Sequence, residues 1–115
     1  MSPASSHLDR DRLARMGVPS DREVTAIFER FVQSLSNRLS DLEEKLHAGD
    51  RTGLRRGLHQ LRGAASSCGF SALAAACSGL EPKVGEAGLA SLRNLAEVSV
   101  LEWRGLTGAG HGGTD

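Results

Sequence analysis

Residues 20–47, SDREVTAIFERFVQSLSNRLSDLEEKLH, carry the clearest amphipathic pattern in the chain and decide its fold class. Apolar residues recur there at three- and four-residue steps, the spacing of one face of an α-helix. They are Val24, Ile27, Phe28, Phe31, Leu35, Leu39, Leu42 and Leu46. Ser20 and Glu23 predict a capping box at the start, and Gly49 predicts a C-terminal cap after His47. One long helix with a single buried face is therefore expected.

Four further amphipathic segments flank this helix. The expected helices cover Asp9–Met16, Arg51–Cys68, the stretch from Ser71 to just before Pro82, and Glu86–Leu106. Asp50 and Ser71 are placed as N-caps of the second and third of these helices. Gly17 and Gly69 are placed as the residues that stop the first and the second. Pro82 limits the third because it lacks an amide donor and disfavours helical geometry in the residue before it.

Strand signals are nearly absent, because the chain has no Tyr, is only 3% aromatic and nowhere alternates with period two over a useful length. Short connections between amphipathic helices favour antiparallel neighbours. The predicted fold is therefore all-α, an antiparallel up-down four-helix bundle with a short additional N-terminal helix. Residues 1–7 are expected to form a flexible leader, residues 8–107 the bundle, and residues 108–115, GAGHGGTD, a disordered tail.

The length of 115 residues fits one domain, and the composition limits the classes of partner that we expect. Fourteen Lys and Arg balance fourteen Asp and Glu, and aromatic residues do not alternate with the arginines, so no nucleic acid is expected as a partner. No signal peptide or membrane span is evident. Cys68 and Cys77 lie among small apolar residues, which indicates buried thiols in a reducing compartment. We expect a cytoplasmic, monomeric domain without direct membrane contact.

The helix expected over residues 51–68 has a polar face that core packing does not explain. A helical wheel puts Leu54, Leu58, Leu61, Ala65 and Cys68 on one side. His59 points away from that side, among arginines. Gly63 also lies away from the core, where a glycine costs about 1 kcal/mol relative to alanine. Two explanations stay open for Gly63: a partner approaches the backbone there, or the glycine reflects drift in a sequence with 14 glycines.

An exposed imidazole such as that of His59 suits nucleophilic chemistry, because a fraction of such groups is uncharged near neutral pH. Arg62, three residues on, and Arg55, four residues before, can offer guanidinium donors to a phosphoryl group on that ring. Cys68 lies on the opposite side of the helix, so a Cys–His pair within this helix is excluded. The histidines and cysteines lack the spacing of a zinc site, and no metal site is expected on this chain.

Residues 58–70, LHQLRGAASSCGF, resemble the signature of the histidine-containing phosphotransfer (HPt) domains of bacterial multistep phosphorelays. That signature has a phosphorylated histidine, a lysine three residues on, and glycines four and ten residues on. His59, Gly63 and Gly69 match it, whereas Arg62 replaces the lysine. The similarity continues in register through Leu73, Cys77 and the pair Leu80-Glu81, and it covers roughly Leu8–Leu106.

The resemblance implies that His59 accepts a phosphoryl group from the phosphoaspartate of a response-regulator receiver domain and passes it to another receiver. It implies that Gln60, Gly63 and Ser66 contact the receiver, and that Arg62 and Arg55 support the phosphoryl group. The family's modules carry phosphoryl groups without ATP binding or autokinase activity of their own. No cofactor is expected on this chain, and Mg²⁺ is expected on the partner receiver.

Two other functions stay open at this point. One is a helical interaction module that binds a receiver or another regulator without being phosphorylated, and Arg62 in place of lysine leaves room for it. The other is a small enzyme that uses His59 as a general base, which is disfavoured because no acid or nucleophile accompanies the histidine. A free-standing carrier and the C-terminal end of a hybrid sensor kinase both fit the sequence, and in the second case the parent kinase would tether the domain to the inner membrane.

Overall fold

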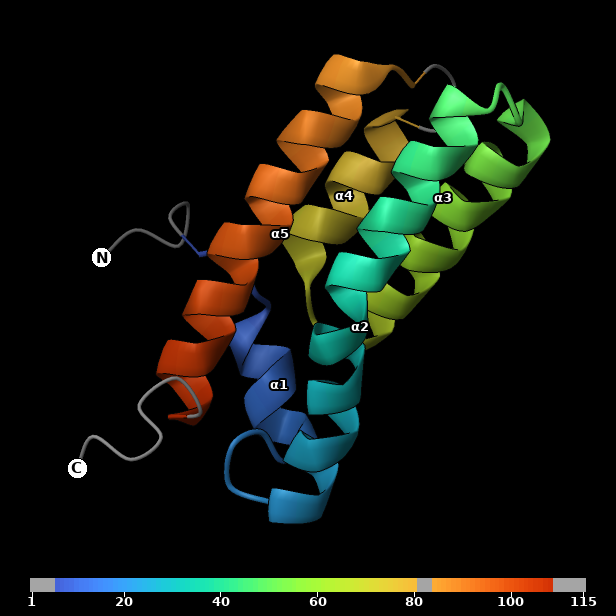
Figure 1. Ribbon diagram of the computed structural model, residues 1–115. Coiled ribbons are helices and arrows are strands. Elements are labelled where there is room, and N and C mark those ends of the chain that lie inside the picture. The colour runs from blue at the N-terminus through green and yellow to red at the C-terminus, as the bar shows by residue number, and fades with distance from the viewer. Residues whose placement is uncertain (1–5, 81–83, 109–115) are drawn as a thin grey trace.

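The computed structural model describes residues 6–80 and 84–108, which contain five helices. They are α1 (Arg10–Met16), α2 (Arg22–His47), α3 (Arg51–Ser67), α4 (Ser71–Leu80) and α5 (Glu86–Thr107). Helices α2 to α5 run alternately up and down, each packs on the next, and α5 closes the ring against α2 (Figure 1). No strand occurs in the described ranges, so the all-α bundle is confirmed. None of these helices is both long and apolar enough to cross a membrane.

The cap of α2 differs by one residue from the sequence prediction. Asp21, not Ser20, is the N-cap: its carboxylate accepts from the amides of Glu23 and Val24 at 2.9 and 3.1 Å. The predicted capping box was therefore wrong: the Asp21 carboxylate accepts from the Glu23 amide, the donor that the Ser20 hydroxyl was expected to satisfy. At the other end Gly49 adopts a φ of 75°, the left-handed conformation that closes a helix at little cost for glycine.

The start of α4 is capped from a distant part of the chain. Ser71 is the first helical residue and not, as predicted, the residue before it. The amide of Ala72 donates to the carbonyl of His7 at 3.2 Å, and the amide of Asp9 donates to the carbonyl of Gly69 at 2.8 Å. The N-terminal segment therefore satisfies backbone groups at the α3–α4 turn. The predicted limit of this helix at Pro82 lies outside the described residues.

An aromatic cluster lies in the core where α2, α5 and the turn between α3 and α4 meet. The ring of Phe70 lies 5.2 Å from that of Phe31 and 6.0 Å from that of Trp103, and Phe28 stacks on Trp103 at 6.4 Å. Trp103 is fully buried, and its indole N–H donates to Glu29 at 2.7 Å. The polar indole group therefore has a partner at the edge of the core, as a buried tryptophan requires.

The predicted apolar face of α2 was wrong at one position. Ile27 is 61% exposed, whereas Val32, which lay outside the predicted stripe, is buried. A helix that buries Phe28 and Phe31 turns position 27 away from the bundle axis, and position 32 takes the inward place beside 31 and 35. The other predicted positions from Phe28 to Leu42 are buried, so the register of the helix stands.

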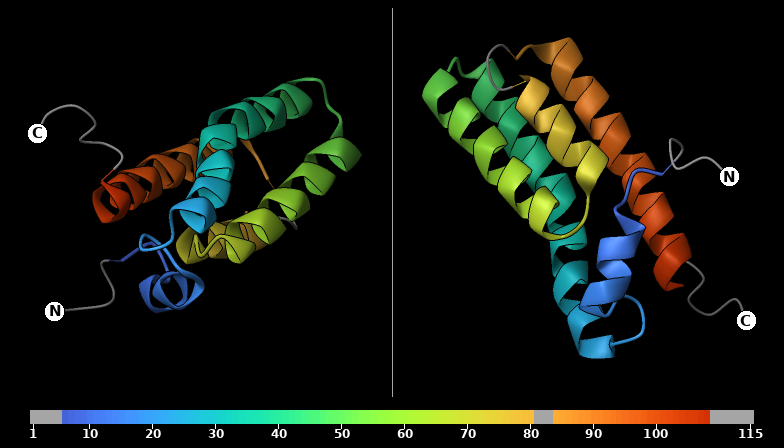
Figure 2. Two further views of the ribbon diagram at one scale, coloured as in Figure 1. Left: turned by 90° about the horizontal axis from the view of Figure 1, so that it is seen from below. Right: turned by 180° about the vertical axis from the view of Figure 1, so that it is seen from behind.

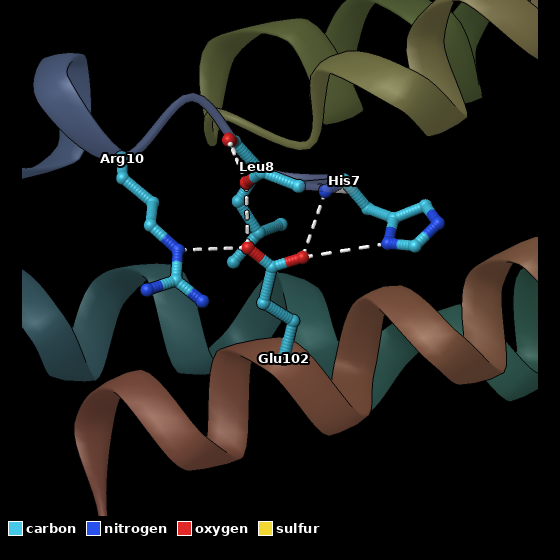
Figure 3. Close-up of polar contacts among 5 residues, drawn as sticks. His7, Leu8, Arg10 and Glu102 are labelled. Atoms are coloured by element: carbon cyan, nitrogen blue, oxygen red, sulfur yellow. Dashed lines mark hydrogen bonds and ion pairs between the residues drawn. The ribbon is translucent and has the colours of Figure 1, made fainter. Parts of the chain in front are cut away.

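The chain segment before α1 is fastened to α5 through one carboxylate. Glu102 accepts from the Ser6 hydroxyl at 2.7 Å, the His7 amide at 2.7 Å and the Arg10 guanidinium at 2.8 Å (Figure 3). Ser6 and His7, expected in a flexible leader, are thus part of the fold. Helix α1 consequently lies at the end of the bundle where α2 begins and α5 finishes (Figure 2).

Replacing Glu102 with glutamine is expected to lower the free energy of unfolding by about 1–2 kcal/mol at neutral pH, because an amide group faces donors that a carboxylate satisfied. Burial raises the pKa of Glu102, but the donors from His7, Ser6 and Arg10 outweigh it and hold the pKa below its usual value. A lowered pKa stabilises the fold above the unfolded-state value of about 4.3, and this contribution is lost as the pH falls further. Urea denaturation at several pH values checks this.

The difference in the free energy of unfolding between wild type and E102Q should therefore become smaller at acid pH. Glu97→Gln, at an exposed position of the same helix, serves as the control and should change the free energy by less than about 0.5 kcal/mol. Equal losses for the two variants, or a gap that stays constant with pH, would show that Glu102 does not anchor the N-terminal segment.

Candidate phosphotransfer site

His59 lies in the middle of α3, on the face turned to solvent. The opposite face of the helix is held in the core by residues one or two turns apart, Leu54, Leu58, Leu61 and Ala65. Asp50 caps the first turn by accepting from the amide of Gly53 at 2.9 Å. Gly69, with a φ of 75°, follows the last turn. A capped helix with a fully packed inner face presents His59 on a rigid backbone.

Arg62 lies one turn after His59 and touches its ring. The Nη2 atom of Arg62 is 3.0 Å from Nδ1 of His59. A guanidinium has donors and no acceptor, so in this contact Nδ1 must be the acceptor. The proton of the neutral ring then belongs on Nε2. The residue that replaces the family's lysine thus contacts the imidazole itself.

A shallow basic depression lies on the other side of His59. It is lined by His59 together with Thr52, Arg55 and Arg56. Arg55 and Arg56 are both exposed, as is Gln60 beside the histidine. Sequence reasoning singled out Arg55 but missed Arg56, although adjacent positions on a helix are 100° apart and two neighbouring cations can flank the same surface. Positive charge therefore lies both before and after His59 along the helix.

A second hollow lies between α3 and α4, beside Gly63. Its lining consists of Arg62, Gly63, Ser66, Ala74, Ala75 and Ser78. All of these residues except Arg62 have small side chains, so little side-chain volume projects from the surface next to the histidine. The contribution of α4 was missed, yet a signal for it exists in residues 71–79, SALAAACSG, which are rich in small residues and poor in charge. Gly63 and Ser66 thus share a surface with residues of the next helix.

Three glycines in α3 occupy different environments. A Cβ atom at Gly57 would come within 2.7 Å of Leu42, so this glycine allows α2 and α3 to approach closely. A Cβ atom at Gly53 would meet the capping carboxylate of Asp50. A Cβ atom at Gly63 would meet nothing within 4 Å. Packing within the described chain therefore explains Gly53 and Gly57 but not Gly63.

Helix α1 borders this surface at the C-terminal end of α3. The guanidinium of Arg12 donates to the carbonyl of Ser66. Leu13 is fully buried against Gly69, where a Cβ atom would come within 2.8 Å of its side chain. Gly69 is thus required both by its left-handed backbone and by the contact with α1. The sequence predicted Gly69 only as the end of the helix and did not predict its close contact with α1.

The cysteines do not join the site. Cys77 is buried, and Cys68 is half-buried on the far side of α3 from His59. Burial raises the pKa of the Cys68 thiol, with Arg38 and Arg12 acting in the opposite direction, so the thiol stays protonated near neutral pH. Among the residues that the structure describes, no three His, Cys, Asp or Glu side chains lie close enough to hold a metal ion.

Comparison with protein families connects this geometry to known proteins. A family model described as the Hpt domain matches residues 26–105, which span α2 to α5 and include His59. Comparison with curated proteins and with solved structures gives no match. The family match covers more than half of the 115 residues. The chain therefore belongs to the family of Hpt domains, helical phosphocarrier modules of two-component phosphorelays that interact with receiver domains.

Proposed function

We propose that this domain takes a phosphoryl group from the phosphoaspartate of a receiver domain onto His59 and passes it to the aspartate of another receiver. The observation that carries the proposal is the exposed imidazole of His59 between basic side chains on a rigid helix. In the transfer a bond forms between a ring nitrogen and phosphorus. The bond between phosphorus and the aspartate oxygen breaks, and its electron pair returns to the carboxylate.

In this proposal the domain supplies the acceptor and little else. Arg62 on one side of His59, and Arg55 with Arg56 on the other, lie where guanidinium groups can offset the charge of the phosphoryl group. Mg²⁺ belongs to the partner receiver, where it balances the charge on the phosphoaspartate side. The domain itself neither binds ATP nor phosphorylates itself, so its role is carriage between two partners.

The receiver docks on the surface of α3 that contains Gln60, Gly63 and Ser66, together with the small residues of α4. Support for this comes from Gly63, since nothing in the described chain requires a glycine there. A low surface next to His59 lets the partner bring its aspartate within bonding distance of the ring. Docking against small side chains also keeps the carrier open to more than one receiver.

Replacing Gly63 with leucine is expected to slow phosphotransfer by at least about tenfold, because the new side chain stands between the receiver and His59. The fold should gain stability, by up to about 1 kcal/mol, since leucine favours the helix more than glycine does. Gly105→Leu is the matched control: position 105 also has open space around a Cβ atom, but it lies near the end of α5. Transfer assays quenched at a series of times compare the rates of phosphotransfer to the two variants.

If G63L and G105L both transferred at the wild-type rate, the docking role of Gly63 would be disproved. Loss of transfer in both variants would point instead to a general effect of leucine on the fold, which circular dichroism detects.

One experiment tests the proposed function against its main alternative. The domain is mixed with a receiver that carries labelled phosphoaspartate, and binding and label are followed together. Transfer of label to this chain, in an acid-labile form, supports the carrier. Tight binding without label would instead favour an interaction module that is not phosphorylated, and would overturn the carrier.

A further inference from the structure

We propose that Arg62 is a positioning residue that controls the proton on the His59 ring and thereby lengthens the life of the phosphohistidine. The proposal rests on phosphorylation of His59. It starts from the 3.0 Å contact between Nη2 of Arg62 and Nδ1 of His59. Both residues lie on α3 one turn apart, so a packed helix holds the pair in register.

The contact favours some protonation states of the ring over others. Arginine stays protonated and only donates, so its hydrogen bond requires a lone pair on Nδ1. A ring with a proton on Nδ1 would set two donors against each other and lose the bond. Arg62 therefore favours the ring with its proton on Nε2. In that form Nε2 has no lone pair, so the contact must open before Nε2 attacks phosphorus: the ring releases its Nε2 proton to solvent and takes a proton on Nδ1. Once the bond to phosphorus has formed, Nδ1 loses its proton to solvent and the contact with Arg62 can form again.

The same preference acts after phosphorylation. In the neutral ring with a phosphoryl group on Nε2, the lone pair remains on Nδ1, so the hydrogen bond from Arg62 persists. When the bond between Nε2 and phosphorus breaks, its electron pair returns to Nε2. The ring leaves as neutral imidazole only if Nδ1 carries a proton. Arg62 disfavours a proton on Nδ1 and therefore slows hydrolysis of the phosphohistidine by water. In that hydrolysis the water oxygen bonds to phosphorus, and the two water protons pass to the phosphate and to solvent.

A docked receiver reverses the effect by drawing the guanidinium toward the phosphoryl oxygens. Nδ1 then becomes open to a proton from solvent, and the bond to phosphorus is ready to break toward the receiver aspartate. Arg62 in this scheme keeps the group on the carrier between encounters and releases it during them. A carbonyl or carboxylate at the same place would act in the opposite sense, because it would stabilise a proton on Nδ1.

The test uses Arg62→Met, which keeps the length of the half-buried side chain and removes its donors. The domain is phosphorylated chemically with phosphoramidate, a small donor that needs no receiver, and the loss of phosphohistidine is followed by ³¹P NMR. The half-life should fall about three- to tenfold, the effect of one hydrogen bond. Arg51→Met removes one positive charge from an exposed position in the first turn of the same helix, outside the hollow beside His59. Its half-life should stay within about twofold of wild type.

Nitrogen NMR of the unphosphorylated domain at alkaline pH gives an independent readout. Wild type should show Nε2 of His59 protonated and Nδ1 not, and R62M should show more protonation at Nδ1. A wild-type proton on Nδ1, or equal half-lives for R62M and R51M, would overturn the proposal. These outcomes are distinct from a failure of the phosphorelay function, because neither measurement involves a receiver.

Discussion

Replacing His59 with glutamine is expected to abolish acceptance of the phosphoryl group while leaving the fold intact. The amide of glutamine lacks the nucleophilic ring nitrogen, so transfer from a labelled receiver should fall to background. The side chain at position 59 is exposed and outside the core. The free energy of unfolding should therefore change by less than about 0.5 kcal/mol. Gel quantification of the label and urea denaturation measure the two effects separately.

His47→Gln is the matched control for this variant. His47 is also exposed, at the end of α2, where its Nε2 lies 3.3 Å from Glu86. H47Q should accept the phosphoryl group at the wild-type rate. Persistent labelling of H59Q, or loss of label in H47Q with His59 present, would assign the chemistry to a different residue.

Replacing Trp103 with alanine is expected to lower the free energy of unfolding by about 3–5 kcal/mol. The indole is completely buried between Phe28 and Phe70, and its removal leaves a cavity that the surrounding helices fill only in part. The loss also deprives Glu29 of the indole donor. A small domain has little stability in reserve, so W103A should be largely unfolded near physiological temperature. Urea and thermal denaturation followed by circular dichroism measure this loss.

Leu101→Ala provides the comparison on the same helix. Leu101 is 67% exposed and should cost less than about 0.5 kcal/mol when truncated. A loss below about 1 kcal/mol for W103A would mean that the aromatic cluster does not hold the end of the bundle together.

The helices could be predicted from the sequence because their signals are local. Periodic apolar residues, Asp50 as a cap and Gly49 as a stop all act within a few residues of one another. The contacts of the N-terminal segment could not be predicted, because Ser6 and Glu102 lie 96 residues apart and neither has an unusual neighbourhood in the sequence. Only the packed bundle brings α5 beside the segment that precedes α1.

The candidate site divides in the same way. Exposure of His59 follows from the helical wheel, since the core side of α3 is unambiguous. The contact of Arg62 with Nδ1 depends on which rotamer the side chain adopts, and spacing alone leaves several within reach. The small residues of α4 beside Gly63 depend on how α4 packs against α3. Sequence therefore identifies the reactive residue, whereas the surface and the proton control around it require the assembled bundle.

The location of the phosphoryl group decides whether His59 is the acceptor. After incubation with a phosphorylated receiver, the domain is digested with trypsin at alkaline pH and analysed by mass spectrometry. Cleavage after Arg56 and Arg62 releases residues 57–62, GLHQLR. Trypsin requires an unmodified guanidinium at Arg62 to cleave there, so a phosphoryl group on this peptide lies on His59. We expect an acid-labile phosphoryl group on this peptide. A peptide that stays unmodified while the receiver loses its label to another site on the chain would contradict it.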